Sequence, residues 1–156
     1  MPHERTLVII KPDAVQRELA GEILSRFERK GLKIVGLKLH SLPIALLEEH
    51  YAHLKSKSFF SELLSYMTST PAILMVLEGK DCVEVVRKMV GTTNARKADM
   101  GSIRGDFGMS TQSNLVHASE SLEAAKQEIT RFFTSKEIHD FTKISFHLLY
   151  ASSERD

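Results

Sequence analysis

A histidine late in the sequence has a context that favours covalent chemistry. His117 lies in the run Ser-Asn-Leu-Val-His-Ala-Ser-Glu-Ser (residues 113–121), at the end of a predicted short strand and just before a predicted helix. Side chains at strand ends emerge into clefts, and a neutral imidazole whose other nitrogen is hydrogen-bonded to an acceptor is a competent nucleophile. Glu128, on the flank of the following helix, has the spacing to fold back and hold the ring. A simple packing role for this histidine is the alternative.

A basic segment is the second candidate for chemistry. Residues 87–104 hold five basic side chains and one acid, a net charge of +4, so the rest of the chain carries −3 within the total of +1. The segment also holds small donors that suit phosphate oxygens. The basic residues are Arg87, Lys88, Arg96, Lys97 and Arg104, the acid is Asp99, and the donors are Thr92, Thr93, Asn94 and Ser102. A solvated basic loop explains the same composition, and both interpretations stay open on these residues alone.

The usual sequence motifs for binding phosphate or metal are absent or incomplete. Residues 31–38 have the glycine spacing of a P-loop, but the lysine is displaced by one position and the run lies inside an apolar strand pattern. If phosphate is bound, Arg and Lys side chains must therefore bind it. His50 and His53 share a predicted helix at i, i+3, yet no Cys or acid at a clear ligand spacing completes a metal set. For these two and for the other histidines apart from His117, we expect surface or core-edge packing.

Length and composition limit the class of protein. With 156 residues, 42% of them hydrophobic, the chain has the size of one domain, 1–156, with a tail of about residues 150–156 expected to be loose. A single cysteine, Cys82, excludes an intrachain disulfide. The longest apolar run, residues 72–77, is too short to span a bilayer, and the start does not read as a secretory signal. We expect a soluble cytoplasmic protein that binds no membrane, and the near-neutral total charge disfavours a general nucleic-acid coat.

Hydrophobic periodicity predicts four strands and five helices. The strands are expected at residues 6–10, 32–39, 72–77 and 114–118. The helices are expected from residue 19 to a stop at Gly31 and at residues 44–54, 60–67, 83–90 and 122–132, the last one capped by Ser119 or Ser121. This order suggests an α+β, ferredoxin-like split βαβ sandwich with a four-stranded antiparallel sheet. Helices on one face would leave the other face free for a ligand or partner. Residues 91–113 are expected to form a long functional loop.

Three motifs give the sequence a family resemblance. They are TLVIIKPDA at residues 6–14, SIRGDF at residues 102–107 and NLVHASE at residues 114–120. Together and in this order they resemble nucleoside diphosphate kinases, and the similarity runs from about residue 4 to residue 150. That family has a ferredoxin-like core, which agrees with the predicted order of elements.

The resemblance implies phosphoryl transfer through a covalent intermediate. A nucleoside triphosphate would give its γ-phosphoryl group to His117, and a nucleoside diphosphate would then take it, with ping-pong kinetics. Mg²⁺ would be coordinated by the nucleotide phosphates, and the protein would supply no metal ligand directly. The expected ligands are thus nucleoside di- and triphosphates. Family members are homo-oligomers, tetramers or hexamers built from a common dimer, and the same is expected here.

Site residues carry over by position from the same resemblance. Lys11 matches the lysine that reaches the transferred phosphate and the sugar hydroxyl, and Asn114 matches the residue that also holds that hydroxyl. Ser119 and Glu128 match the pair that orients the histidine. Tyr51 matches a tyrosine near it, although its helix face fits a core role equally well. The remaining matches bind the nucleotide, with Phe59 stacking on the base and Arg87, Thr93 and Arg104 forming the phosphate clamp.

Some residues depart from the family pattern. Glu120 replaces the usual Asp and keeps an acid at the helix start. Ser58, before the stacking ring, and Thr111, on the other side of the base, are expected to weaken the grip on the nucleotide. Ala95 and Met100 stand where the long loop often has proline, which raises the entropy of the unfolded loop.

Two other classes of protein compete with this interpretation. A catalytically silent nucleotide sensor would use the same pocket, but the intact set of candidate residues disfavours it. A nucleic-acid-binding protein would use the basic loop. The near-neutral total charge and the lack of an aromatic ribonucleoprotein motif on a strand disfavour that class, so nucleic acid is not an expected partner.

Overall fold

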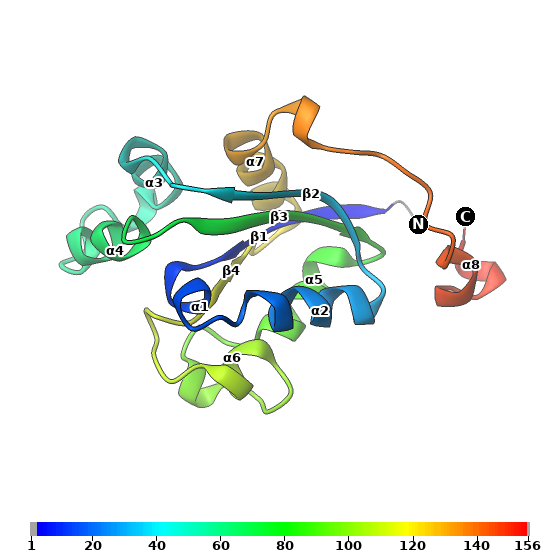
Figure 1. Cartoon of the computed structure of the whole chain (residues 1–156), viewed down its shortest axis with the longest axis horizontal. Coiled ribbons are helices and arrows are strands. Elements are labelled where there is room, and N and C mark those ends of the chain that lie inside the picture. Colours follow the sequence, from blue (N-terminus) through cyan, green and yellow to red (C-terminus); the bar gives the residue numbers. More distant parts are fainter. Residues whose placement is uncertain (1–2, 156) are drawn as a thin grey trace.

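One antiparallel sheet organises the protein. The computed structural model describes residues 3–155, and its strands lie in the order β2-β3-β1-β4. They are β1 (Glu4–Ile10), β2 (Lys33–His40), β3 (Ala72–Gly79) and β4 (Val116–Ala118). Strand β1 pairs with β3 and β4, and β2 pairs with β3, always antiparallel. This is the ferredoxin-like α+β arrangement, so the predicted fold class is confirmed (Figure 1).

Helices fill the connections between the strands. They are α1 (Pro12–Gln16), α2 (Ala20–Lys30), α3 (Ile44–His50), α4 (Phe60–Met67), α5 (Cys82–Val90), α6 (Ile103–Phe107), α7 (Leu122–Phe132) and α8 (Phe146–Leu149). Short 3-10 helices occur at Ala52–Leu54, Ala95–Lys97, Ser135–Glu137 and Ser152–Glu154. Across residues 3–155, none of the helices has the length and apolar character needed to cross a bilayer.

Both faces of the sheet are covered by helices. Every residue from Leu7 to Ile10 of β1 is fully buried, a pattern that a strand with one open face does not show. Leu7 and Ile9 belong to a core cluster with α3, α4 and α7, whereas Val8 and Ile10 belong to a second cluster with α2, α5 and α6. The two layers can be followed above and below the strands in Figure 1. The expectation of one free sheet face is therefore wrong, because both side-chain rows of β1 are apolar and each needs a cover.

Three short helices, α1, α6 and α8, lie where no helix was predicted. Helix α1 follows β1 directly, with Pro12 in its first turn, where a missing N–H costs nothing. Helix α6 lies within residues 91–113, and the hydroxyl of Ser102 caps it by accepting a hydrogen bond from Gly105 N at 3.1 Å. The predicted long loop is thus partly helical, because single turns of this length carry too few apolar residues to show a period.

Strand β4 is shorter than predicted. The prediction covered residues 114–118, but the extended ladder begins at Val116. Leu115 has a φ of 74°, in the left-handed region that a non-glycine residue rarely adopts. This residue therefore interrupts the extended backbone and sets Asn114 apart from the strand.

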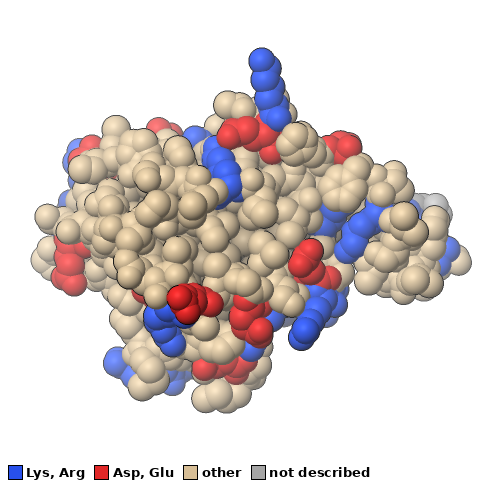
Figure 2. All heavy atoms as spheres, in the orientation of Figure 1, with Lys and Arg blue, Asp and Glu red and all other residues tan. Residues whose placement is uncertain are grey.

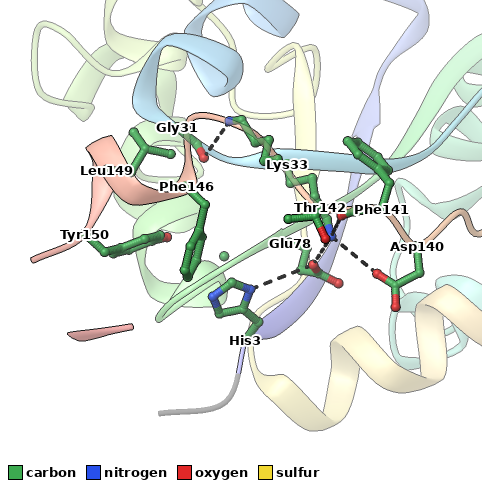
Figure 3. A pocket seen from close by; sticks show the side chains of 12 residues that line it. His3, Gly31, Lys33, Glu78, Asp140, Phe141, Thr142, Phe146, Leu149 and Tyr150 are labelled. Atoms are coloured by element: carbon green, nitrogen blue, oxygen red, sulfur yellow. Dashed lines mark hydrogen bonds and ion pairs between the residues drawn. The ribbon is translucent and has the colours of Figure 1, made fainter. Parts of the chain in front are cut away.

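The chain after α7 returns to the far end of the sheet. Lys143 Nζ donates a hydrogen bond to Gly31 O at 3.0 Å, which fastens this segment at the start of β2. Helix α8 follows, and a cavity of about 430 Å³ forms beside it (Figure 3). Its lining includes His3, Lys33, Glu78, Phe141, Phe146 and Tyr150. The cavity lies at the amino end of β1, whereas His117 pairs with Ile9 near the carboxyl end of that strand.

Candidate active site

The candidate nucleophile is held by a carboxylate and a serine. His117 lies opposite Ile9 in the sheet, so its side chain faces the layer of α3, α4 and α7. Its Nε2 atom is 2.9 Å from Oε2 of Glu128 on α7. Ser119 Oγ donates to the same carboxylate oxygen at 2.6 Å and accepts from Leu7 N at 3.2 Å. The structure thus brings together the three residues whose spacing and motif suggested one site.

Hydrogen bonding keeps this carboxylate charged. Burial raises the pKa of Glu128, but hydrogen bonds from His117 and Ser119 outweigh it and hold the pKa below its ordinary value. The side chain of His117 is 21% exposed, and its Nδ1 atom makes no hydrogen bond to any of residues 3–155. A proton on Nε2 satisfies the carboxylate and leaves the lone pair of Nδ1 free.

A second histidine packs on the first. His50, the last residue of α3, presents its ring edge-on to His117 with the ring centroids 4.7 Å apart. It also contacts Tyr51 at 4.5 Å and Phe132 at 5.1 Å between centroids. Burial, together with the nearby His117, lowers the pKa of His50 to about 3, so this ring is neutral. Surface or core-edge packing was expected for His50, and its contact with His117 was missed, because only the tertiary fold joins α3 to β4.

Tyr51 is buried beside the ring of His50. It belongs to the core cluster that includes α3 and α4, which agrees with the core role left open by its helix face. Burial and the charge of Glu128 raise the pKa of its hydroxyl above the ordinary value. Within the described residues this buried hydroxyl has no hydrogen-bond partner.

The lysine after β1 is tied to the segment between α5 and β4. Lys11 Nζ donates to Asn114 Oδ1 at 2.8 Å, and Asn114 Nδ2 donates to the backbone oxygens of Thr93 at 2.9 Å and Thr111 at 2.8 Å. Burial and the nearby Arg104 lower the pKa of Lys11 to about 8. The ammonium group is therefore charged at neutral pH but titrates more easily than an ordinary lysine.

Arg104 holds the backbone around the site. Its Nε donates to Asn114 O at 3.2 Å, Nη1 donates to Gly91 O at 2.8 Å, and Nη2 donates to Val116 O at 2.6 Å. Burial and the nearby Arg87 lower its pKa to about 10, which still leaves the group charged at neutral pH. A guanidinium has five N–H donors, so two remain for another ligand. Arg104 therefore has a positioning role in addition to the charge that it brings.

The other predicted site residues are exposed. Arg87 is exposed at the end of α5 and lines a cavity of about 660 Å³, and Thr93 is exposed in the loop that follows. Phe59 precedes α4 with 42% of its surface exposed, and among residues 3–155 no hydrogen bond or ring contact joins it to the other site residues. Lys88 instead pairs with Glu84 at 2.5 Å on an exposed helix face. The basic segment therefore does not converge on the site as a whole.

An aspartate in the first motif also shapes the site. Asp13, in the first turn of α1, accepts a hydrogen bond from Leu115 N at 3.1 Å and another from the hydroxyl of Tyr66 on α4. One carboxylate thus joins α1, α4 and the residue that precedes β4. The available signal was an acid directly after Pro12 at a helix start, but α1 itself was not predicted.

Known proteins share both the sequence and the fold. A family model described as nucleoside diphosphate kinase matches residues 4–138. A nucleoside diphosphate kinase from Methanothermobacter thermautotrophicus is 49% identical over 147 residues, which cover 94% of this chain and 98% of the relative. One from Pyrococcus horikoshii is 52% identical over 143 residues, which cover 90% of this chain and 91% of the relative.

Solved structures agree with these matches. The halophilic nucleoside diphosphate kinase from Halobacterium salinarum, in complex with CDP, superposes with a TM-score of 0.94 at 43% identity, covering 96% of this chain and 100% of that one. A nucleoside diphosphate kinase family protein from Babesia bovis gives a TM-score of 0.91 at 38% identity, covering 94% and 99%. The sequence motifs, the sheet and these relatives agree: the chain belongs to the nucleoside diphosphate kinase family, whose members are phosphotransferases.

Proposed function

We propose that His117 carries the phosphoryl group between two nucleotides. The 2.9 Å contact between His117 Nε2 and Glu128 supports this most strongly, because it orients the ring and leaves the Nδ1 lone pair free. Nδ1 attacks the γ-phosphorus of a nucleoside triphosphate, the bond from phosphorus to the β–γ bridging oxygen breaks, and the diphosphate leaves. A terminal oxygen of a second diphosphate then attacks the same phosphorus, and the bond to Nδ1 breaks.

Glu128 and Ser119 act on the histidine and do not touch the phosphate. As the bond between Nδ1 and phosphorus forms, positive charge develops on the imidazole. The Glu128 carboxylate stabilises that charge through Nε2–H, and Ser119 holds the carboxylate in place at 2.6 Å. Both are thus positioning residues in this mechanism.

The cations of the site stabilise the phosphate oxygens. Transfer through a loose transition state depends on positioning and charge rather than on covalent help from other groups. Lys11, Arg104 and Arg87 supply that charge, and Asn114 shares the sugar hydroxyl with Lys11. Thr93 completes the clamp, Tyr51 packs on His50, which in turn packs on His117, and Phe59 stacks on the base. Stacking reads no hydrogen-bond pattern, which fits a broad range of bases.

Mg²⁺ is the proposed cofactor, carried by the nucleotide. The side chains proposed to meet the phosphates, Lys11, Arg87, Thr93, Arg104 and Asn114, offer ammonium, guanidinium, hydroxyl and amide groups. They provide no carboxylate cage, which fits a hard cation held by phosphate oxygens and water. When bound, the ion offsets phosphate charge, and the same five side chains would hold the nucleotide that carries it.

We also propose a homo-oligomer, a tetramer or a hexamer, in which β2 contributes to an interface. Strand β2 is an edge strand, and Leu37 and Leu39 on it are 51% and 65% exposed. Figure 2 shows the face of the molecule that β2 crosses in Figure 1. Charged side chains lie mostly around the margin of this face, and a broad area over its middle is uncharged. A long edge strand with exposed leucines favours association, and its two lysines, Lys33 and Lys38, are already held in ion pairs with Glu78 and Glu137.

The remaining parts of the proposal concern the whole chain. We propose a single domain for residues 1–156, since Lys143 fastens the segment after α7 to Gly31. We propose a cytoplasmic location, because the substrates are nucleotides and Cys82 is a free, buried thiol that needs no oxidising compartment. A nucleic-acid partner is not proposed, since the basic segment does not form one surface: Arg104 is buried at the site and Lys88 is held in an exposed ion pair with Glu84.

A labelling experiment tests the mechanism. The protein is incubated with γ-labelled ATP and Mg²⁺, and a phosphoprotein that is labile in acid and stable in base is expected. Addition of a second nucleoside diphosphate should remove the label as labelled triphosphate. Label that persists in His117→Ala contradicts the assignment of the nucleophile, and label that forms but cannot be chased indicates a sensor instead of a kinase.

A further inference from the structure

Three potential metal ligands meet beside the proposed nucleophile. One ligand atom from each of His50, His117 and Glu128 lies within 4.8 Å of the other two. Nε2 of His117 and Oε2 of Glu128 are already 2.9 Å apart. The three side chains come from α3, β4 and α7, so three separate elements hold them in place.

His50 has no role in the mechanism that explains its position. Its side chain is buried, and neither ring nitrogen has a hydrogen-bond partner within residues 3–155. Buried polar groups are almost always paired, so an unpaired one points to a bound water or ion. A neutral imidazole with a free lone pair is also a common metal ligand. The ring lies edge-on to His117, which brings this lone pair close to the pair formed by His117 and Glu128.

The chemistry of the donors selects the kind of metal. Two imidazole nitrogens and one carboxylate oxygen suit Zn²⁺ and similar borderline cations, whereas Mg²⁺ and Ca²⁺ prefer oxygen alone. Three protein ligands leave a fourth position open for water, and His117 is 21% exposed, which provides access. Zinc lies about 2.0–2.1 Å from such ligands, so small side-chain rotations must draw the three atoms together.

We propose that His50, His117 and Glu128 bind Zn²⁺ or a chemically similar divalent cation, and that the bound metal switches off the phosphoryl-transfer histidine. In the metal-free ring the proton is on Nε2, facing the carboxylate. A metal on Nε2 requires the proton to move to Nδ1, the atom that must attack phosphorus. The metal also binds the Glu128 carboxylate, which then no longer stabilises positive charge on the imidazole. The metal site is independent of the proposed mechanism, whereas the inhibition rests on it.

Cobalt binding tests the site without any nucleotide. Co²⁺ substitutes for Zn²⁺ and reports its coordination by visible absorption. Wild-type protein should bind one Co²⁺ per chain with the strong d–d bands of four- or five-coordination, and an excess of Zn²⁺ should remove them. His50→Phe keeps an aromatic ring in the same packing and lacks the ligand. We expect binding at least about 100-fold weaker, since loss of even an outer partner of a metal ligand costs about 10–100-fold.

A neighbouring histidine provides the matched control. His53 lies one turn further along and is exposed, so His53→Phe should bind Co²⁺ as the wild type does. Equal binding by the wild type and His50→Phe, or the absence of the d–d bands in the wild type, overturns the proposal.

Nuclear magnetic resonance of the wild type covers the case in which His50→Phe does not fold. Imidazole ¹⁵N signals of His50 and His117 should shift on addition of one equivalent of Zn²⁺, while the five other histidines stay unchanged. Shifts confined to those five overturn the site.

Phosphorylation after zinc loading tests the inhibition. Zn²⁺-loaded wild-type protein should take up label from Mg·ATP at least tenfold more slowly, and a chelator should restore the rate. If the rate is unchanged with the metal bound, the proposed inhibition is rejected but the proposed metal site stands. Absence of metal binding with normal labelling rejects the site and leaves the proposed mechanism intact.

Discussion

His117 Nε2 and Glu128 Oε2 lie 2.9 Å apart, across the gap between the last strand of the sheet and helix α7. The contact depends on the turn between them. Ser121 caps α7 by accepting a hydrogen bond from Ala124 N at 3.1 Å, and Glu128 lies seven residues later, about two helical turns along the axis. The carboxylate therefore lies on the side of α7 that faces β4.

Replacing Glu128 by Gln should slow the phosphorylation of His117. The amide has no charge, and a charge-assisted hydrogen bond is worth about 1.5–3 kcal/mol, so a loss of about 10- to 100-fold in the single-turnover rate is expected. Rapid quenching after mixing with Mg·ATP measures that rate. Glu123→Gln removes an exposed carboxylate from the same helix and should leave the rate unchanged. Equal rates in the two variants reject an orienting role for Glu128.

The parts of the site that follow local rules were predictable from the sequence. The apolar run of β1, the capped start of α7 and the spacing from His117 to Glu128 are visible along the chain, and the contact that they imply is present. The family motifs added Lys11 and Asn114, and these two residues are joined at 2.8 Å.

Tertiary features were beyond such rules. The packing of His50 on His117 joins α3 to β4, two elements far apart in sequence. The left-handed backbone of Leu115 is imposed by its surroundings, since its N–H is held by Asp13 and its side chain is fully buried. Contact of Arg104 with phosphate stays a prediction, but the binding of three of its donors to backbone oxygens was not foreseen, because only the folded loop brings those oxygens to it.

The pH dependence of nucleotide capture should report Lys11. Its pKa in the free protein is lowered to about 8 by burial and by Arg104. The charged form binds phosphate, so kcat/KM should be nearly full at pH 7 and fall by about tenfold per pH unit well above pH 8. Bound phosphate raises the pKa of the ammonium, so kcat should stay level to higher pH. In Lys11→Gln the alkaline limb should vanish from an already low kcat/KM, whereas a wild-type profile that stays flat well above pH 8 contradicts the assignment.

A proline at position 100 should stabilise the segment between α5 and α6. Ser102 N donates to Asp99 O at 3.1 Å, and Gly101 has a φ of 93°, so Met100 lies at the second position of a type II turn, which favours proline. Met100 is 83% exposed, so Met100→Pro removes no packing and should add about 0.4–1 kcal/mol to the free energy of unfolding.

Gly101→Ala, at the next residue of the same turn, should have the opposite effect and destabilise the protein. No atom lies within 4 Å of the added methyl group, so only the left-handed backbone opposes it, at a cost of about 1–2 kcal/mol. Thermal unfolding at one fixed protein concentration measures both variants. If Met100→Pro lowers the unfolding temperature, the assignment of Met100 to a type II turn is wrong.

A charge on the β2 edge should weaken self-association. Leu39 is 65% exposed on this strand, and a lysine there would be buried in an interface built on β2. Leu39→Lys should therefore lower the molar mass measured by sedimentation or light scattering. Gln127→Lys adds the same charge on the exposed side of α7 and should leave the mass unchanged. A Leu39→Lys protein with the wild-type mass excludes β2 from the interface.

The nitrogen that carries the phosphate tests the central claim most directly. Because Nε2 of His117 faces Glu128, the phosphoryl group must be on Nδ1. Phosphorus and ¹⁵N nuclear magnetic resonance of the protein after reaction with Mg·ATP distinguishes the two attachment sites. The structure predicts a single phosphohistidine with its phosphorus bonded to Nδ1 of His117, absent in His117→Ala. Phosphorus bonded to Nε2, or a phosphohistidine that persists in that variant, would contradict the mechanism.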